Sequence, residues 1–184
     1  AGKAWQLLGM SCFAHGDLAG ALVNLRHAAA LDQDDSSIWD NLGIVLHKSG
    51  DHDAARAAFS AAIALAPAAA GIWSNAAGNE LDAGHHAESL RLAEKAVALA
   101  PGHAAVWHQL GNALIELRRS SEAERALRQA LRIQPRNSEA LLSLSYGLVA
   151  QNRLSEARDA ATTALQIAPG CSRIHVSLGS IHNS

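Results

Sequence analysis

Histidine is the chemically versatile side chain that stands out in this sequence, with ten among 184 residues. A zinc site needs three or four ligands that converge tetrahedrally, often with two histidines at i and i+4 on one helix. The close pairs have other spacings: His85/His86 are adjacent, His47/His52 and His103/His108 are five apart, and His175/His182 are seven apart. Because no third ligand is evident beside any pair, we interpret these histidines as surface residues and expect no metal.

A basic stripe is the second chemical feature, and it consists of Arg125, Arg128, Arg132 and Arg136 at helical spacing. Such a stripe could contact phosphate groups. However, Glu122 and Glu124 lie beside it, and the chain has a formal net charge of −2. A chain with so little net charge has no large field to attract nucleic acid or an anionic membrane. We therefore interpret the stripe as a solvated helix face and predict no nucleic-acid partner and no membrane insertion.

Motifs for catalysis are absent from the sequence, which has no G-x-S-x-G, P-loop, G-x-G-x-x-G or H-E-x-x-H pattern. We predict no enzymatic activity and no cofactor. Cys12 occupies a helix position where a buried thiol acts as a small apolar group. Cys12 and Cys171 lie near opposite ends, too far apart for a disulfide in an elongated array. Reduced thiols, together with the lack of a signal-peptide pattern, predict a cytoplasmic protein.

Composition predicts the elements that carry these residues. Apolar residues make up 49% of the chain but aromatic residues only 4%, and just four prolines interrupt it. Much of the apolar content is alanine, which is the best helix former and lets helices approach closely. The expected fold class is all-α.

A period of 34 residues organises the whole chain. The tryptophans at 5, 39, 73 and 107 and the prolines at 67, 101, 135 and 169 follow this period. Three residues after each tryptophan position stand Leu8, Leu42, Leu110, Leu144 and Leu178, with Ala76 as the exception. The next position is small throughout: Gly9, Gly43, Ala77, Gly111, Ser145 and Gly179. A fixed period of this length is typical of stacked helical hairpins.

These positions resemble the tetratricopeptide repeat (TPR) family, whose pattern is W-x2-L-G, later A-x3-F and then A and P. Phe59 keeps the late aromatic position, and Leu25, Ala93, Leu127 and Ala161 replace it in the other repeats. The resemblance implies a right-handed α-solenoid. The predicted repeats span residues 2–35, 36–69, 70–103, 104–137 and 138–171, in one TPR domain over 1–184, with an extra helix at 172–184.

Helix boundaries can also be predicted from local signals. Gly16, Gly50 and Gly84 fall between the two helices of a repeat, where a left-handed cap suits glycine. Asn152 can take the same conformation, whereas Arg118 is the exception to the pattern. Ser36 and Ser138 are predicted N-caps. We also expect Trp39, Trp73 and Trp107 to be largely buried between helices.

In TPR arrays the first helix of each repeat lines a concave surface, so the resemblance implies candidate binding residues at fixed repeat positions. These candidates are mostly polar: Asp40, Asn41, His47, Lys48, Ser74, Asn75, Asp82, His108, Gln109, Asn112, Glu116 and Tyr146. Amides both donate and accept hydrogen bonds, and can therefore bind an extended peptide backbone without selecting its side chains. The predicted function is a scaffold that binds another protein or an extended peptide.

Two alternatives remain open. The long TPR arms of O-linked N-acetylglucosamine transferases carry a ladder of asparagines, which Asn41 and Asn75 match and Gln109 approaches, whereas Leu7, Ser143 and Ser177 depart from it. The chain could therefore be the substrate-recognition arm of a larger enzyme such as a glycosyltransferase. A self-assembling scaffold, joined through the ends of the array, is the other alternative. The basic residues with which chaperone-binding TPR proteins hold a carboxylate are missing here.

The last segment, 172–184, repeats the first-helix pattern through Leu178 and Gly179. Ile174, Leu178 and Ile181 form an apolar face, and His175, Gly179 and His182 form the face that would receive a second helix. Glycine costs about 1 kcal/mol relative to alanine in an exposed helix. We therefore expect the natural protein to continue past Ser184 with a partner helix.

Overall fold

The computed structural model describes the backbone of residues 1–182 and the side chains of residues 1–179. This part of the chain forms eleven helices and no strand. The helices are α1 (Gly2–Ala14), α2 (Leu18–Leu31), α3 (Ser36–Lys48), α4 (His52–Leu65), α5 (Ala70–Asp82), α6 (His86–Leu99), α7 (Ala104–Glu116), α8 (Ser120–Ile133), α9 (Ser138–Val149), α10 (Leu154–Ile167) and α11 (Ser172–His182). Residues 183 and 184 of the predicted last helix, and the side chains of Ile181 and His182, lie outside the described part.

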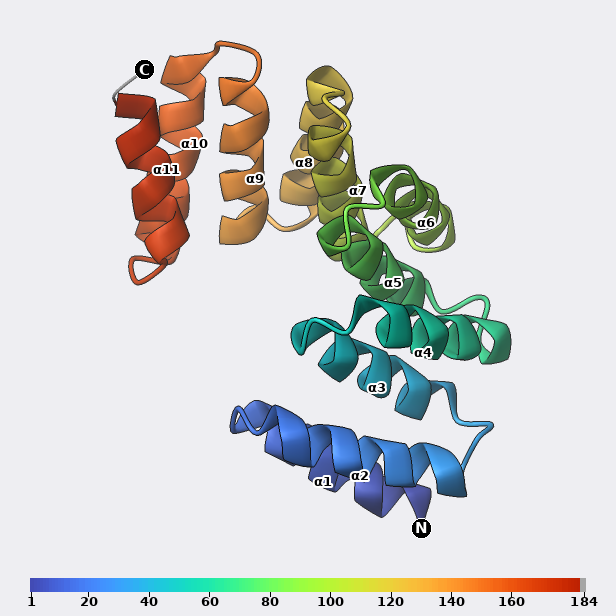
Figure 1. Cartoon of the computed structure of the whole chain (residues 1–184). Helices are drawn as coiled ribbons and strands as arrows, with labels where there is room; N and C mark the ends of the chain where they lie inside the picture. The colour runs from blue at the N-terminus through green and yellow to red at the C-terminus, as the bar shows by residue number, and fades with distance from the viewer. Residues whose placement is uncertain (183–184) are drawn as a thin grey trace. The chain divides into compact units, whose positions relative to one another are not determined.

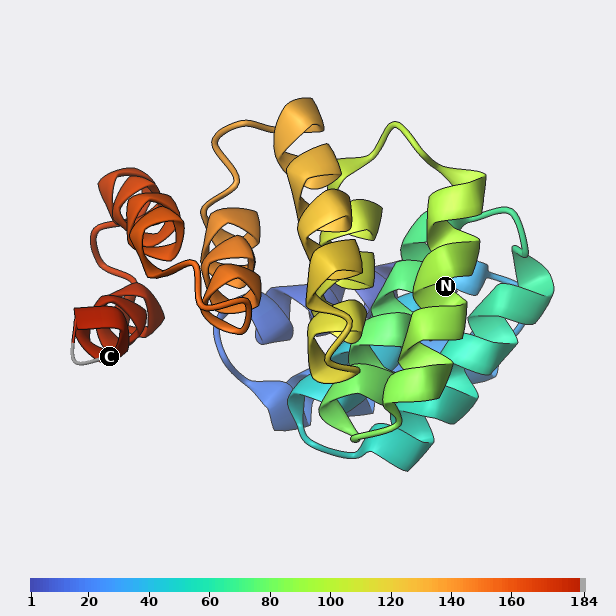
Figure 2. The ribbon, with the colours of Figure 1, turned by 90° about the horizontal axis from the view of Figure 1, so that it is seen from above.

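The chain divides into two compact units, residues 1–99 and 100–184. Each unit is built of helical hairpins, in which an odd-numbered helix (A helix) pairs with the next helix (B helix), as Figures 1 and 2 show. In the first unit, α2 also packs on α3 and α4 on α5, while α3 contacts both α1 and α5. In the second unit, α9 lies between α7 and α11 in the same way. The A helices of each unit therefore form one continuous side.

The crossing of the A and B helices depends on the small residue at the eighth position of each repeat. A Cβ atom added at Gly43 would lie 2.6 Å from Phe59 Cε1, and one added at Gly111 would lie 2.5 Å from Leu127 Cγ. At Gly9 the same atom would lie 2.8 Å from Leu25 Cγ. These distances are shorter than van der Waals contact, so the B helix brings a large side chain against the bare backbone of the A helix.

Two hairpins use a different pair of residues at the same crossing point. Where the A helix carries Ala77 or Ser145 instead of glycine, the B-helix residue sixteen positions later is Ala93 or Ala161 rather than Leu or Phe. Both alanines are fully buried. A larger A-helix residue is therefore accompanied by a smaller B-helix residue, which avoids the overlap that a Cβ atom would otherwise cause.

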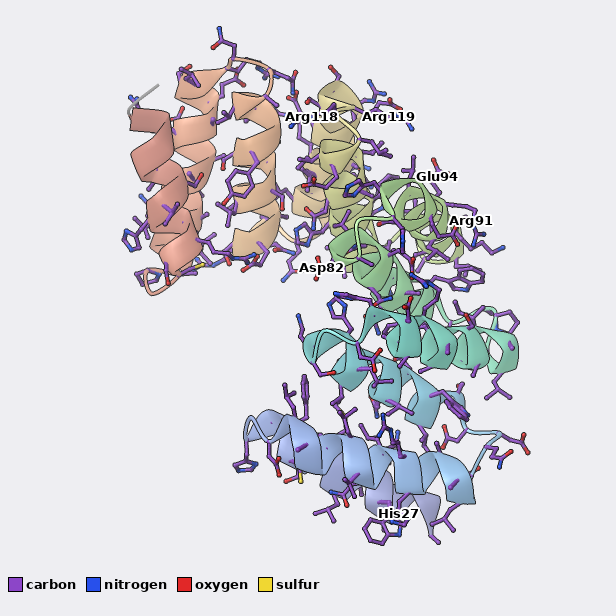
Figure 3. All side chains as sticks on the ribbon, in the orientation of Figure 1. His27, Asp82, Arg91, Glu94, Arg118 and Arg119 are labelled. Atoms are coloured by element: carbon purple, nitrogen blue, oxygen red, sulfur yellow. The ribbon has the colours of Figure 1, made fainter. Side chains whose placement is uncertain are left out.

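The turns within the hairpins share a left-handed residue. Gly16, Gly50 and Gly84 have φ between 81° and 84°, and Asn152 and Arg118 have φ of 59°. Arg118, the exception in the sequence pattern, thus adopts the same cap as the others, in the turn between α7 and α8 (Figure 3). The amide of Arg119 donates to the carbonyl of Leu114 at 2.9 Å, which closes this cap. The cap geometry therefore prevails over the preference of arginine for negative φ.

The prediction that Ser36 and Ser138 are N-caps is wrong by one residue. The caps are Asp35, whose carboxylate accepts from the Ser37 amide at 2.9 Å, and Asn137, whose side chain accepts from the Ala140 amide at 3.0 Å. Aspartate and asparagine cap at least as well as serine. Because each precedes the serine directly, the helix begins one residue earlier than the serine pattern implied.

The tryptophans lie at the edge of the core, with most of their surface buried. Trp39, Trp73 and Trp107 are each partly exposed. Each indole Nε1 donates to a carbonyl six residues earlier, at 2.8 Å to Gln33, 2.9 Å to Pro67 and 2.8 Å to Pro101. Because a desolvated indole N–H needs a partner, the ring reaches out to the turn between repeats. The tryptophan therefore fastens each A helix to the turn that precedes it.

The matched packing of the hairpins yields a test in the second unit. Gly111→Ala should destabilise the protein by about 1–3 kcal/mol through overpacking against Leu127, and Leu127→Ala by about 2–5 kcal/mol through the space it leaves. The double variant recreates the alanine pair found at 77 and 93 and should cost clearly less than the sum. Urea denaturation of the four proteins measures this coupling. Strict additivity of the two free-energy changes would contradict the matching.

Candidate functional site

The A-helix side of the first unit is held together by polar side chains. Asn75 Nδ2 on α5 donates to Asp40 Oδ1 on α3 at 3.0 Å, and Gln6 Nε2 on α1 donates to Ser37 Oγ on α3 at 2.9 Å. Burial raises the pKa of the Asp40 carboxyl, and the hydrogen bond from Asn75 partly offsets this. Two predicted site residues, Asp40 and Asn75, are thus brought together from neighbouring repeats.

A second contact between α3 and α5 centres on Asn79, which is fully buried. Its Nδ2 atom donates to the backbone carbonyl of His52 at 3.0 Å and to Glu80 Oε1 at 3.1 Å. Its Oδ1 atom lies 3.0 Å from His52 Nδ1 and 3.3 Å from His47 Nδ1. Because an amide oxygen can only accept, both imidazoles donate from Nδ1. His47 Nε2 lies 3.3 Å from Asp82 Oδ2, and this contact between two predicted site residues is a hydrogen bond only when the ring also carries a proton on Nε2.

Glu80, which is only 3% exposed, is the charged member of this cluster. Arg56 on α4 binds it in a bidentate manner, at 2.8 Å from Nε and 3.0 Å from Nη2, and His85 Nδ1 lies 2.9 Å from Oε2. Burial would raise the pKa of Glu80, but the hydrogen bonds from Arg56 and His85 outweigh burial and hold the pKa below its usual range. The carboxylate is therefore ionised and fully engaged at neutral pH.

Asn79 and Glu80 were missed in the sequence, although a signal exists. Their repeat positions carry Val45 and Leu46 one repeat earlier and Ala113 and Leu114 one repeat later. Two adjacent polar residues at positions that are otherwise apolar indicate a polar cluster inside the stack. We name this cluster, formed by His47, His52, Arg56, Asn79, Glu80, Asp82 and His85, the Asn79–Glu80 cluster.

In the second unit the A-helix side has a smaller polar contact. His108 Nε2 on α7 lies 3.0 Å from Ser143 Oγ on α9 and 3.3 Å from Asn112 Nδ2. Burial lowers the pKa of His108, and Arg173 also lowers it, whereas Glu139 opposes them. A neutral His108 can accept from both neighbours through Nε2, which requires the proton on Nδ1. His108 and Asn112 are predicted site residues, and Ser143 is an addition.

The other predicted site residues differ in exposure. Lys48, Asp82, Glu116 and Tyr146 are exposed, with Asp82 at the C-terminal end of α5 (Figure 3), whereas Asn41, Ser74 and Gln109 are half-buried. Gln109 Nε2 is buried and has no hydrogen-bond partner within the described residues. Since Asn41 and Asn75 belong to the first unit and Gln109 and Asn112 to the second, the expectation that all four line one surface stays a prediction.

Apolar side chains also occupy the repeat positions of the A-helix side, although none of them was predicted as a binding residue. Leu7 occupies the repeat position of Asn41 and Asn75 and is 73% exposed. Met10 and Phe13 are half-buried at the repeat positions of Ile44 and His47. The 34-residue period alone would have placed them.

Two further kinds of site are absent from the described residues. Within them, no three His, Cys, Asp or Glu side chains come close enough to hold a metal ion. None of the helices described is both long and apolar enough to cross a membrane. Cys12 and Cys171 are free thiols.

Comparison with known families decides the identity of the repeat. Two family models, each described as tetratricopeptide repeat, match the chain: one over residues 80–145 and 119–181, the other over residues 36–69. The chain belongs to the tetratricopeptide repeat family. TPR proteins are generally non-catalytic scaffolds for protein interactions. A search of curated proteins found no match.

Solved structures confirm the α-solenoid fold class. A thermophilic TPR protein of Thermus thermophilus is 22% identical, with a TM-score of 0.85 and full coverage of both chains. MamA of Desulfovibrio magneticus is 21% identical, with a TM-score of 0.75 over 90% of this chain and 94% of that one. PilF of Pseudomonas aeruginosa is 18% identical, with a TM-score of 0.82 over 98% and 88%. At such identities the likeness concerns the fold alone.

The lowered pKa of His108 predicts how the stability of this TPR protein depends on pH. The folded state binds a proton at His108 less readily than the unfolded chain, whose histidine pKa is about 6.5. The free energy of unfolding should therefore fall as the pH drops through about 6.5. In His108→Gln the amide oxygen still accepts from Asn112 and Ser143, but this titration is gone. Urea denaturation at pH 5.5 and 7.5 should show a smaller loss in the variant, and equal losses would contradict the prediction.

Proposed function

We propose that this TPR protein is a binding scaffold for an extended segment of another protein, which lies along the A helices in the concave groove expected of a TPR array. The observation that carries the proposal is a polar contact between neighbouring A helices in each unit: Asn75 to Asp40 at 3.0 Å in the first, and His108 to Ser143 at 3.0 Å in the second. These contacts orient amide, hydroxyl and imidazole groups across adjacent repeats. A ligand that crosses several repeats then meets a series of prearranged donors and acceptors, which lowers the entropic cost of binding.

The side chains favour recognition of a peptide backbone. The proposed contact residues are Asp40, Asn41, His47, Lys48, Ser74, Asn75, Asp82, His108, Gln109, Asn112, Glu116 and Tyr146, joined by the exposed Leu7. Amides can bond both the N–H and the C=O of an extended chain. Lys48, Asp82 and Glu116 are exposed charges, and Tyr146 offers a large amphipathic ring at little entropic cost. Specificity for particular side chains would come from these last residues.

The rest of the proposal follows from the chemistry of the chain. The five repeats form one TPR domain, with the boundaries given by the 34-residue period. The protein has no catalytic activity of its own, because no nucleophile, base and oxyanion donors converge among the contacts described. A net charge of −2 supports a protein partner over nucleic acid. Two free thiols support a cytoplasmic location.

Selection from a random peptide library against the full chain provides the ligand for the test. Asn41→Ala and Asn75→Ala should each weaken the selected peptide by about 1 kcal/mol or more, which is a fivefold or greater rise in Kd. The Asn41 variant is the cleaner one, because Asn41 makes no side-chain hydrogen bond within the described residues, whereas Asn75→Ala leaves Asp40 without its donor. Arg158→Ala, an exposed position on α10, is the matched control and should change nothing.

Isothermal titration calorimetry of the wild type and the three variants measures these affinities. Unchanged affinity in both asparagine variants would refute backbone binding at this row. Light scattering as a function of protein concentration tests the alternative of self-assembly, for which growth of the particle with concentration would be the sign.

A further inference from the structure

A cavity of about 250 Å³ lies in the first unit, among α4, α5 and α6. Its apolar wall consists of Phe59, Ile63, Trp73, Ala76 and Leu92. The B helices α4 and α6 supply most of this wall, so the cavity is separate from the polar row described above. It also lies beside the partly exposed ring of Trp73, whose N–H is already bound to Pro67.

One residue of the third repeat, Ala76, makes the wall of this cavity different from the other repeats. Ala76 stands where the other repeats carry leucine, at Leu8, Leu42, Leu110, Leu144 and Leu178. A leucine at residue 76 would place three more carbon atoms at this part of the wall. The related depression lined by Trp39 and Leu42 is also open, at about 370 Å³, so a cavity recurs at this junction and Ala76 changes the shape of its wall rather than creating it.

The charged side chains at the rim of the cavity are paired with one another, and one guanidinium nitrogen is left for a ligand. Arg56 binds Glu80, and Arg91 binds both oxygens of Glu88, at 2.8 Å from Nε and 2.5 Å from Nη2. Arg91 projects from the outer side of α6 (Figure 3). The carboxylates are therefore occupied, whereas Arg91 Nη1 has no hydrogen bond within the described residues.

Lys95 is a further cation, and it lies beside the ring of Trp73. Lys95 Nζ lies over Trp73, 6.0 Å from the ring centroid, in the range of a cation–π contact. Its N–H groups make no hydrogen bond within the part of the chain that the structure describes. Arg56 and Arg91 are balanced by Glu80 and Glu88. Lys95, which lies beside Trp73 but is not among the residues that line the cavity, therefore supplies the net positive charge that complements a carboxylate.

The size of the cavity limits its occupant. Pockets for cofactors and drug-sized ligands span roughly 300–1,000 Å³, so this cavity suits a single side chain. Side chains that fill such pockets are often the anchors on which a protein interface depends.

We propose that this cavity is an anchor site for a partner protein, in which it takes one aliphatic or aromatic side chain that is flanked by a carboxylate. The partner's side chain fills the space beside Ala76, and the partner's carboxylate binds Arg91 and Lys95. The site lies on the B-helix side, so the protein has a second binding surface besides the A-helix row.

N-acetyl-L-leucine serves as the probe, because it combines an aliphatic side chain with a carboxylate, and N-acetyl-L-leucinamide is its uncharged counterpart. Titration of the full chain, followed by ¹H–¹⁵N NMR, should give saturable shifts of the Trp73 indole N–H and the Leu92 amide at roughly millimolar probe. The amide should bind at least threefold more weakly. No saturable shift at these two groups, or equal binding of both probes, would overturn the proposal.

Two variants locate the site. Ala76→Leu restores the residue of the other repeats and should weaken the probe at least tenfold, while Arg91→Gln should weaken N-acetyl-L-leucine to the level of the amide. Arg26→Gln is the control, because it lies in a related depression under Trp39 and should leave binding unchanged. Unaltered binding of the probe to Ala76→Leu would refute the site, and if that variant fails to fold, the Arg91 result decides alone.

The peptide selected for the A-helix row should bind Ala76→Leu as it binds the wild type, so the two surfaces are tested independently.

Discussion

The close crossing of the two helices in each hairpin is the constraint on which the rest of this structure depends. A large B-helix side chain lies against a bare glycine in three hairpins, at Gly9, Gly43 and Gly111. A hairpin closed in this way buries its small residues internally and leaves the two outer surfaces of the A helix for its neighbours. One surface packs on the preceding B helix, and the other carries the polar row.

Contacts between hairpins follow different rules from contacts within them. The packing inside a hairpin is mostly apolar and follows the 34-residue period, with a few polar contacts such as Ser89 Oγ to the Ala77 carbonyl at 2.8 Å. The polar contacts between α3 and α5 differ from those between α7 and α9. The Asn79–Glu80 cluster is the strongest example. Removal of Arg56 would leave the carboxylate of Glu80, which is only 3% exposed, without its bidentate partner. The cost should lie below the roughly 3–5 kcal/mol of a fully buried pair, because the Arg56 side chain is itself 40% exposed. Arg56 on α4 and Glu80 on α5 therefore match these two hairpins to each other.

The sequence was informative wherever a residue obeys the repeat. The helices, the left-handed caps and the small residues of the crossing all follow from the 34-residue period, and even Arg118 adopts the φ that its position requires. The polar contacts were harder to predict, because Asn79 and Glu80 depart from the repeat and their partners come from another hairpin. For the tryptophans, the period gives the positions of the rings but not the carbonyl that each indole N–H group binds. Whether the candidate residues of the two units share one surface depends on geometry that no repeat position encodes.

The internal matching of each hairpin has an evolutionary consequence. Because Gly43 and Phe59, or Ala77 and Ala93, lie within the same 34 residues, duplication or loss of one whole repeat carries both halves of the match together. New arrays can therefore arise by copying hairpins without any adjustment of their cores. Pairs that join neighbouring repeats are the exception: Glu124 and Arg153 link the fourth and fifth repeats, and Arg56 and Glu80 link the second and third. Repeats joined in this way should be inherited as a block, and their paired arginine and glutamate should be gained or lost together among descendants of this chain.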